Sequence, residues 1–416
     1  MTEAFGDRSK VGITMAGPLA IDGGTKLRRE PFPAWPVHDE REIQALREVV
    51  VSGNWGGFPS PNERAAAFAE QFAAYHTARF GCCTASGTTA LEVALKVAGV
   101  RPGDEVIVPA LTFVATGAAP LYLGAVPIFV DIDPDTWCID AEAAERAITE
   151  RTRAIIPVHL GSRIADMDRI VELARRHGLR VIEDCAHMHG GFWRDKGVCS
   201  VGDLGCFSFQ NTKLMSAGEG GIIITSDEEL ARRCHAYVDC GRLRPGDDPA
   251  SSQGVFGWNY RLTEFQAAIL SVQLERLPDQ TRTREANKRR LTERLERIAG
   301  IDTLKEDERV TQPSGYGFFF KYCASSFGAP RDQFVAALRA EGIPCHGAFY
   351  EPVYKDKLFS WQDTNVQYDY GNVSCPVAER AAYEESVWLP HELFLGSQQD
   401  VDDIAAAVEK ITNAWA

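Results

Sequence analysis

Several residues of this 416-residue sequence could together bind a phosphate group and form a Schiff base. An apolar run leads into Ser86, Gly87 and Thr88, which are small or carry hydroxyls and precede a helical pattern. The free N–H groups and the dipole at a helix N-terminus favour phosphate. Ser and Thr are also common helix caps, so this stretch alone is a weak signal. It matches neither the phosphate-binding Walker motif nor the dinucleotide GxGxxG motif.

A second candidate is Asp184, which directly follows the apolar residues Leu179, Val181 and Ile182. A carboxylate at the mouth of a buried strand needs a partner, because an unpaired buried charge is costly. Asp184 could be a helix cap or one half of an ion pair. It could equally keep a heterocyclic nitrogen protonated.

Two further candidates are an aromatic residue and a lysine. Phe113 follows the run Val108–Leu111 and could either fill the core or stack on a planar cofactor. Lys213 comes five residues after Ser208 and before the Gly-rich turn 216–221. Most lysines are solvated surface residues. A buried lysine, however, has a depressed pKa and can form a Schiff base.

Together these residues supply the parts that a pyridoxal phosphate site requires. They are a phosphate cup, a stacking aromatic, a carboxylate for the pyridine nitrogen, a hydroxyl for the phosphate and a lysine for the imine. They also follow successive apolar runs, and ligands of open α/β sheets bind at the carboxyl ends of the strands.

The elements that must position these residues alternate between strand and helix. Short apolar runs predict seven strands, at Gly81–Thr84, Glu105–Val108, Val126–Val130, Ala154–Val158, Arg180–Glu183, Gly205–Phe209 and Gly221–Thr225. Helical patterns occur at Glu40–Val51, Asn62–Ala74, Thr88–Val100, Asp140–Ile148 and Asp166–His177. The alternation predicts an α/β fold with a mostly parallel sheet between helices.

The pattern changes in the last third of the chain. Two long helices are predicted at Thr263–Leu277 and Arg282–Ala299. A strand, a helix, an aromatic loop and a final helix follow, at Tyr316–Cys323, Arg331–Glu341, Phe349–Tyr370 and Val401–Trp415. We therefore predict an irregular N-terminal arm (1–35), a large cofactor-binding domain (36–285) and a smaller α+β C-terminal domain (286–416).

Composition excludes several classes of protein. The formal net charge of −14 disfavours nucleic acid as a partner. No run approaches 18 apolar residues, and the polar start lacks the apolar core of a signal peptide, so no membrane partner and a cytoplasmic location are expected. The 11 cysteines are scattered through a long chain, which does not indicate a disulfide scaffold. Their spacing from His residues predicts no metal site.

The sequence resembles the DegT/StrS sugar aminotransferases, a branch of the fold-type I pyridoxal phosphate enzymes. The similar arrangement covers about residues 30 to 412. Each stretch is weak alone, but seven in the same order make chance an unsatisfactory explanation. They are Ser86–Leu91, Val108–Phe113, Pro157–Leu160, Glu183–His187, Phe207–Lys213, Gly218–Gly221 and Asn259–Glu264.

The resemblance implies a role for each candidate. Lys213 would hold pyridoxal phosphate as a Schiff base and shuttle a proton, Asp184 would pair with the pyridine nitrogen, and Phe113 would stack on the ring. His187 stands where the family has Gln or His beside the cofactor. The phosphate would be bound by Ser86, Gly87, Thr88 and Ser208, and by Asn259 of a neighbouring subunit. This last role implies a homodimer with shared active sites.

The resemblance also implies the reaction. Members that dehydrate sugars have His in place of the Schiff-base lysine, so Lys213 favours transamination through pyridoxal and pyridoxamine phosphate. Many relatives have a Tyr-x-Pro-x-His run near the substrate, whereas here Tyr354 takes the place of His. This departure argues against simply transferring a nucleotide-sugar substrate. Candidate substrate residues are His346, Tyr350, Tyr354 and Arg261, the last from the partner.

Two subgroups look most similar. One comprises the glutamine-dependent aminotransferases of keto-cyclitols such as scyllo-inosose in aminoglycoside (antibiotic) pathways, which make aminocyclitols. The other comprises the 3-amino-5-hydroxybenzoate synthases. We therefore expect a small-molecule donor, glutamine or glutamate, and a keto-cyclitol or keto-sugar acceptor. An aminating and aromatising enzyme, a nucleotide-sugar aminotransferase and a non-catalytic cofactor-binding protein remain alternatives.

Overall fold

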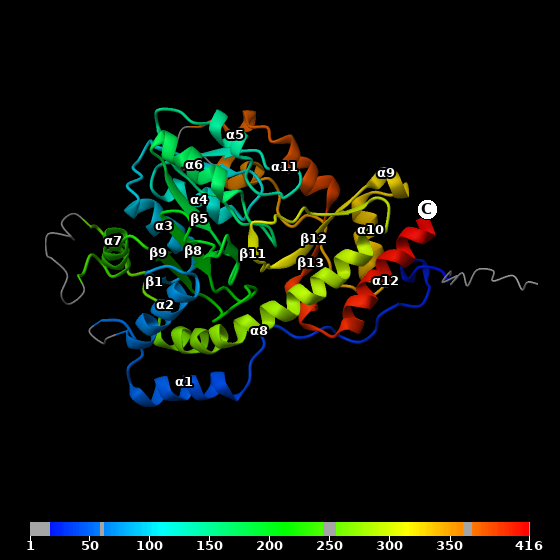
Figure 1. Ribbon diagram of the computed structural model, residues 1–416, viewed down its shortest axis with the longest axis horizontal. Coiled ribbons are helices and arrows are strands. Elements are labelled where there is room, and N and C mark those ends of the chain that lie inside the picture. The colour runs from blue at the N-terminus through cyan, green and yellow to red at the C-terminus, as the bar shows by residue number, and fades with distance from the viewer. Residues whose placement is uncertain (1–16, 59–61, 244–254, 361–367, 416) are drawn as a thin grey trace, which may run out of the picture.

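A seven-stranded sheet forms the centre of the protein, as a computed structural model shows for residues 17–58, 62–243, 255–360 and 368–415 (Figure 1). The strand order is β1-β9-β8-β5-β4-β2-β3. The strands are β1 (Phe80–Thr84), β2 (Glu105–Pro109), β3 (Val126–Val130), β4 (Thr152–Ile155), β5 (Arg180–Asp184), β8 (Leu204–Ser208) and β9 (Gly221–Thr225). All seven predicted strands are thus present.

The sheet is mostly parallel, as expected. Strands β3, β2, β4, β5 and β8 run parallel to one another, whereas β9 is antiparallel to both β8 and β1. Strand β4 ends at Ile155, short of the predicted Val158, and Pro157 lies just beyond it. Proline has no N–H to donate to a ladder.

Helices flank this sheet. Helix α3 packs across β5, β8 and β9, and α2 packs against β1. The predicted helices are found as α1 (Glu40–Ser52), α2 (Glu63–Tyr75), α3 (Gly87–Val97), α5 (Ala141–Arg146) and α6 (Met167–His177). Two more helices, which the apolar periodicity did not reveal, are α4 (Val114–Tyr122) and α7 (Glu228–Val238).

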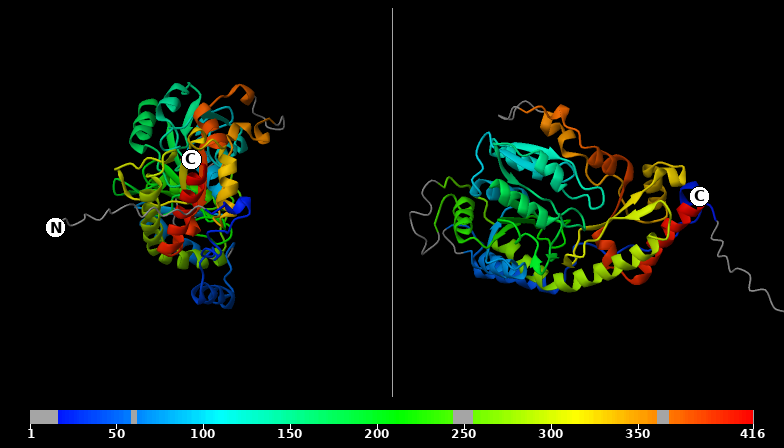
Figure 2. Two further views of the ribbon diagram at one scale, coloured as in Figure 1. Left: turned by 90° about the vertical axis from the view of Figure 1, so that its right-hand side faces the viewer. Right: turned by 45° about the horizontal axis from the view of Figure 1, so that its top comes forward.

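The prediction of two long helices is wrong, because one helix, α8 (Glu264–Leu295), replaces both. It runs straight through Pro278, which a sequence reading takes as a break. Its packing against α1, α2 and α12 offsets the lost hydrogen bond of the proline. In Figures 1 and 2, α8 extends from beneath the large sheet to the C-terminal helices.

The C-terminal part contains a second sheet, β10 (Ile301–Thr303), β12 (Gly317–Tyr322) and β13 (Ser386–Pro390), all antiparallel. Its helices are α9 (Ala324–Phe327), α10 (Arg331–Ala340), α11 (Pro376–Arg380) and α12 (Gln398–Trp415). A small third sheet joins β11 (Val310–Gln312), β6 (Phe192–Trp193) and β7 (Lys196–Gly197). No helix in the described ranges is both long and apolar enough to cross a membrane.

Two hydrophobic clusters lie at the ends of α8. Leu270 and Leu277 belong to the cluster around the large sheet, and Leu291 and Leu295 belong to the cluster of β10, β12, α10 and α12. The predicted boundary between 285 and 286 falls inside this helix and stays a prediction. Residues 17–35 of the predicted arm contain only a short turn, Ala20–Asp22. Residues 1–16, and 361–367 of the predicted aromatic loop, lie outside the described ranges.

Candidate active site

A cavity of about 290 Å³ lies at the carboxyl ends of β1, β2, β5 and β8. This is where open α/β sheets bind their ligands. The structure brings most of the predicted residues together here. Its lining includes Ser86, Gly87, Thr88, Phe113, Asp184, His187, Ser208 and Lys213.

The start of α3 forms one wall of the cavity. Ser86 and Thr89 make a capping box, in which the Ser86 hydroxyl accepts from the Thr89 N–H (3.1 Å). A Cβ on Gly87 would lie 2.7 Å from the Cβ of Ser208, so only glycine lets β8 approach the helix this closely. The N–H groups of the first helical turn lack partners within the helix. The wall therefore combines hydroxyls with free N–H groups and suits a phosphate.

Asp184 ends β5 and is buried at the base of the cavity. Its Oδ2 accepts a hydrogen bond from the Thr116 hydroxyl (2.9 Å), and its Oδ1 accepts one from the Ala186 N–H (3.1 Å). Burial raises the pKa of Asp184, while these two bonds and the Lys213 charge oppose the rise. The carboxylate is therefore held in place but lacks full compensation of its charge.

Lys213 lies in the loop after β8 and is only 9% exposed. Loss of solvation lowers the pKa of its amine to about 8, although nearby Asp184 opposes this shift. The amine lies 4.5 Å from the centre of the Tyr316 ring. No ion pair of Lys213 is found among the described residues. An amine of this kind is neutral often enough near neutral pH to act as a nucleophile or base.

The backbone before Lys213 is fixed by side chains from distant parts of the chain. The carbonyl of Asn211 accepts from the indole N–H of Trp35 (2.8 Å). The carbonyl of Thr212 accepts from Nε2 of the buried His391 (3.0 Å). The N-terminal arm and the segment after β13 therefore both position the lysine.

His187 stands beside the cavity as a neutral ring. Its Nδ1 accepts from the Gly161 N–H (3.3 Å), which assigns the proton to Nε2, 3.3 Å from the Tyr350 hydroxyl. The ring stacks on Tyr316 with centroids 4.3 Å apart. Burial and the Lys213 charge hold the pKa of His187 well below its usual value. The residue can donate one hydrogen bond but carries no charge.

Phe113 is the exposed aromatic residue of the lining, with 51% of its surface accessible. It is the residue before α4, and its ring lies 5.9 Å from that of Tyr350. A large apolar ring left accessible at the edge of a cavity offers a face for a planar ligand.

The predicted substrate residues are dispersed. Tyr350 contacts His187 and Phe113, but it is not among the residues that line the cavity, and neither are His346, Tyr354, Arg261 and Asn259. Tyr354 is instead buried between α11 and Phe129. Its hydroxyl donates to Glu379 and accepts from the Cys375 N–H (3.0 Å). These contacts place Tyr354 in a packing role and do not support the predicted substrate contact.

The remaining candidates lie on other parts of the surface. His346 is exposed, with its ring 5.1 Å from Trp388. Arg261 forms an ion pair with Asp239, whose backbone is also bridged to Asn259. Within one chain, Asn259 and Arg261 therefore lie apart from the cavity lining.

Sequence reasoning missed two residues beside the cavity. Thr116 bonds Asp184, and its signal was its position one helical turn after Thr112 in the recognised Val108–Phe113 stretch. Tyr316 contacts both Lys213 and His187 and bonds Thr212 (2.6 Å). Its position in the chain gave no signal, since it comes from the C-terminal part, 103 residues after Lys213 (316 − 213).

A disulfide was also missed. Cys185 and Cys199 are bonded, although no bonded pair was expected from their spacing. The N–H groups of Cys199, Val201 and Gly202 donate to the Glu183 carboxylate, which His159 also contacts. Cys185 lies near His159 and Glu183 in a group with metal-binding residue types, but its sulfur is already used in the disulfide. This network fixes the backbone on both sides of Asp184.

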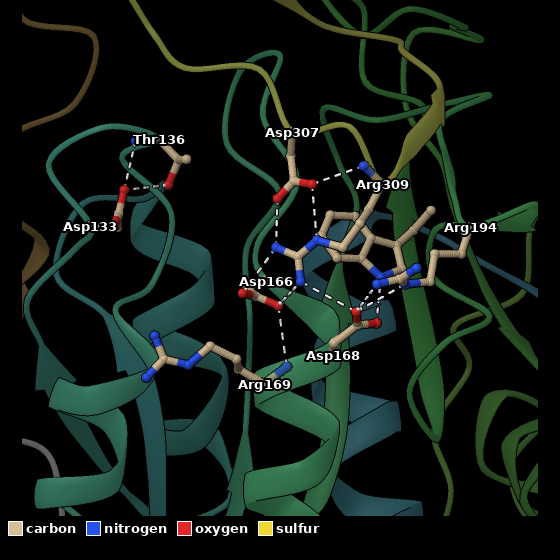
Figure 3. A network of polar contacts seen from close by, with 9 residues as sticks. Asp133, Thr136, Asp166, Asp168, Arg169, Arg194, Asp307 and Arg309 are labelled. Carbon is tan, nitrogen blue, oxygen red and sulfur yellow. Dashed lines mark hydrogen bonds and ion pairs between the residues drawn. The ribbon is translucent and has the colours of Figure 1, made fainter.

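A second polar hollow, between α5, α6 and the segment before β11, has a different character (Figure 3). Arg309 contacts the carboxylates of Asp166, Asp168 and Asp307 at 2.6 to 3.3 Å. Arg194 also pairs with Asp168. These contacts lower the pKa of Asp168 to about 2 and raise that of Arg309. Here the charges compensate one another.

The residues of the first cavity fit a phosphorylated heteroaromatic aldehyde. The α3 wall offers donors to the phosphate, Asp184 offers a carboxylate to a ring nitrogen, and Lys213 offers an amine to the aldehyde carbon. Phe113 and His187 offer flat faces for the ring. The donor set matches pyridoxal phosphate group by group.

Comparison with known proteins agrees with this chemistry. The DegT/DnrJ/EryC1/StrS aminotransferase family matches residues 36–409. A protein of Streptoalloteichus tenebrarius, whose name proposes it as an L-glutamine:3-amino-2,3-dideoxy-scyllo-inosose aminotransferase, is 44% identical, covering 95% of this chain and 98% of that protein. The L-glutamine:2-deoxy-scyllo-inosose aminotransferase of Streptomyces fradiae is 39% identical, with coverage of 95% and 98%.

A solved structure has the same fold. The crystal structure of 3-amino-5-hydroxybenzoic acid (AHBA) synthase superposes with a TM-score of 0.83 at 32% identity, covering 93% of this chain and 100% of that chain. The similarity to both relatives and to this solved structure therefore includes the residues of both hydrophobic clusters.

Proposed function

The chain belongs to the DegT/DnrJ/EryC1/StrS aminotransferase family of pyridoxal phosphate enzymes, and from this premise we propose that it transfers an amino group from glutamine or glutamate to a keto-cyclitol. The observation that carries the proposal is Lys213, a buried amine with a lowered pKa in a cavity that fits the cofactor. The names of the relatives from Streptoalloteichus tenebrarius and Streptomyces fradiae support a scyllo-inosose-like acceptor in aminoglycoside-type biosynthesis.

Each lining residue takes one task in this proposal. Ser86, Gly87, Thr88 and Ser208 bind the phosphate, and Phe113 and His187 lie against the ring. Asp184 keeps the ring nitrogen protonated, because an ionised carboxylate favours the positive charge beside it. When bound, pyridoxal phosphate supplies the electron sink that makes the carbon next to the amino group acidic.

Lys213 moves the proton. Its amine would hold the cofactor through the aldehyde carbon, and the free amine would accept the proton from the donor carbon that carries the amino group. The Tyr316 ring beside the amine and the hydrogen bonds to the carbonyls of Asn211 and Thr212 restrict where the amine can lie. The acceptor half-reaction uses the same proton transfer in reverse.

Tyr350 lies next to the cavity, because it contacts the lining residues His187 and Phe113. The Tyr350 hydroxyl, next to the His187 Nε2, can bond a ring hydroxyl of a cyclitol. Apart from Lys213, the cavity lining contains no Lys or Arg. A neutral polyol ketone suits this lining better than a nucleotide sugar, whose phosphates need cationic partners.

We further propose that two copies of the chain share their active sites. Ser86 and Thr88 line the cavity and also a neighbouring surface hollow with Tyr122, Phe256 and Trp258, three largely exposed aromatic residues. Exposed aromatic clusters of this kind mark interaction surfaces. A second copy seated there brings its Asn259 to the phosphate and its Arg261 to the substrate. We also propose that this assembly works in the cytoplasm.

A labelling experiment tests the acceptor. Purified enzyme is incubated with amide- and amine-labelled glutamine, each with scyllo-inosose, 2-deoxy-scyllo-inosose, an aminated shikimate-type ketone or a nucleotide keto-sugar. We expect labelled nitrogen in an inosose product. Label only in the shikimate-type product would favour an AHBA-synthase-like reaction, as the fold neighbour suggests, and label only in the nucleotide sugar would reject the cyclitol.

A spectroscopic experiment tests the cofactor role. The purified protein is expected to be yellow. After borohydride reduction, which fixes the cofactor on its lysine, the bound cofactor should be found on the peptide that contains Lys213. A colourless protein that takes up no pyridoxal phosphate would contradict the whole proposal, including the non-catalytic cofactor-binding alternative.

A further inference from the structure

We propose that Thr116, oriented by Thr112, is a positioning residue that keeps the Asp184 carboxylate ionised and directed into the cavity. The inference rests on the proposed function, in which Asp184 meets the ring nitrogen of the cofactor. Neither threonine is needed to touch the reacting atoms for this role.

The geometry forms a chain of three groups. The Thr112 and Thr116 hydroxyls are 3.0 Å apart, and the Thr116 hydroxyl is 2.9 Å from Oδ2 of Asp184. Thr112 and Thr116 are 2% and 0% exposed. The described structure thus offers these hydroxyls little water as an alternative partner.

The order of the protons follows from the chemistry of the groups. An ionised carboxylate only accepts hydrogen bonds, so the Thr116 hydroxyl must donate its single proton to Asp184. The proton between the two hydroxyls must then come from Thr112. A hydroxyl that accepts one bond becomes a better donor in the next, so Thr112 strengthens the bond to the carboxylate.

The position of the pair in the fold links it to the stacking residue. Phe113 is the N-cap of α4, Thr112 directly precedes it, and Thr116 lies in the first turn of the helix, where its hydroxyl meets that of Thr112. The same turn therefore presents Phe113 to the ring face of the ligand and Thr116 to the carboxylate that meets its nitrogen.

The charges around Asp184 show why such a device is needed. Burial raises the pKa of the carboxyl, and the charges of Lys213 and His159 only partly oppose it. Burial raises the pKa of the neighbouring groups Cys206, on β8, and Tyr350, and the Asp184 charge adds to both rises. A protonated Asp184 has no charge with which to hold a proton on a ring nitrogen.

The experiment measures Asp184 directly in the cofactor-free protein. Its carboxyl titration is followed by infrared difference spectroscopy against Asp184→Asn. The variants are Thr116→Val, Thr116→Ala, Thr116→Ser, Thr112→Val and the double Thr112→Val/Thr116→Val. Thr412→Val is the matched control, because its hydroxyl is equally buried but bonds the Val408 carbonyl on α12. Pyridoxal phosphate affinity is measured in parallel by fluorescence quenching.

We expect Thr116→Val and Thr116→Ala to raise the pKa of Asp184 by about one unit and weaken pyridoxal phosphate binding about tenfold. Thr116→Ser should restore both values. Thr112→Val should change the Asp184 pKa and the pyridoxal phosphate affinity by smaller amounts. In the Thr116→Val background it should change neither value further, because Thr112 acts through Thr116. Thr412→Val should match the wild type.

Three outcomes would overturn the inference. They are an unchanged Asp184 titration in both Thr116→Val and Thr116→Ala, no rescue by serine, and an effect of Thr112→Val that is equal in both backgrounds. If Thr116→Val fails to fold by circular dichroism, Thr116→Ala and Thr112→Val still decide. If the protein binds no pyridoxal phosphate, the proposed function fails while the infrared titration still tests the threonines.

Discussion

The Lys213 cavity and the Arg309 network both bring cationic and anionic side chains together, yet they treat charge in opposite ways. Arg309 contacts three carboxylates in a partly solvated hollow (Figure 3), and each of these three carboxylates has a cationic partner. Lys213 and Asp184 are more deeply buried and are only loosely coupled to each other. Full pairing shifts pKa values away from neutrality, whereas burial with incomplete pairing shifts them toward it. Chemistry at neutral pH needs the second arrangement.

The largest expected effect comes from removing the lysine. Lys213→Ala should reduce transamination by at least about a thousandfold, since both cofactor attachment and proton transfer are lost. The measurement is the single-turnover rate with glutamine, with circular dichroism as the control for folding. Retained turnover would show that the incomplete pairing of Lys213 has no catalytic purpose.

A smaller effect is expected on the pH dependence of stability. The pKa of Lys213 falls from 10.5 to about 8 on folding, so between these values the unfolded chain binds more protons and stability rises with pH. Below pH 8 the burial of Lys213 lowers the free energy of unfolding by a full amount on the order of 3 kcal/mol, and above pH 10.5 this loss disappears.

Subtraction isolates this contribution. Urea unfolding of the cofactor-free protein is compared with that of Lys213→Met from pH 7 to 10.5. As the pH rises across this window, the free energy of unfolding of the wild type should increase relative to that of Lys213→Met. Parallel curves would mean that Lys213 is solvated and that the contrast with Arg309 is not one of burial.

Arg309→Ala is expected to have a modest effect on stability and none on turnover. It leaves Asp166, Asp168 and Asp307 without their common partner, which should cost about 1 kcal/mol, because part of the network is solvent-screened. Chemical denaturation measures the loss, and the transamination rate is the control. A fall in the rate with unchanged stability would reverse the roles assigned to the two regions.

The smallest effect concerns acid and salt. Because the pKa of Asp168 is depressed to about 2, its contribution is present above its ordinary value of 3.8 and is lost as the pH falls toward 2. Adding salt at pH 7 should reduce the stability difference between wild type and Arg309→Ala. Thermal unfolding at 0.05 and 1 M salt provides the measurement, and a difference independent of salt would indicate a packing role for Arg309.

The sequence allowed prediction of those features that depend on residue type and on order along the chain. Seven apolar runs became the seven strands of the large sheet, and the residues at the ends of β1, β2, β5 and β8 met in one cavity because parallel strands end at the same edge. Lys213 and Asp184 were recognisable since few residue types can perform their chemistry.

The features that escaped prediction depend on contacts distant in sequence. Tyr316 reaches the cavity from the C-terminal part, and Trp35 and His391 reach the loop before Lys213 from near the two ends of the chain. Pro278 suggested a break in α8 that packing on both sides overrides. Tyr354 stands at a motif position where many relatives have His, and the direction of its side chain depends on Glu379, which lies 25 residues further on.

The unbroken helix α8 has a mechanical consequence. It contributes Leu270 and Leu277 to one hydrophobic cluster and Leu291 and Leu295 to the other, and Pro278 lies between these two pairs. A proline inside a helix leaves one backbone hydrogen bond unmade and is a common point of bending, so α8 can bend between the two clusters. Such a movement would shift the C-terminal sheet relative to the cavity, and with it Tyr316, the residue just before β12 whose ring lies next to the Lys213 amine. Opening and closing of the pocket would then directly change the surroundings of the reactive amine.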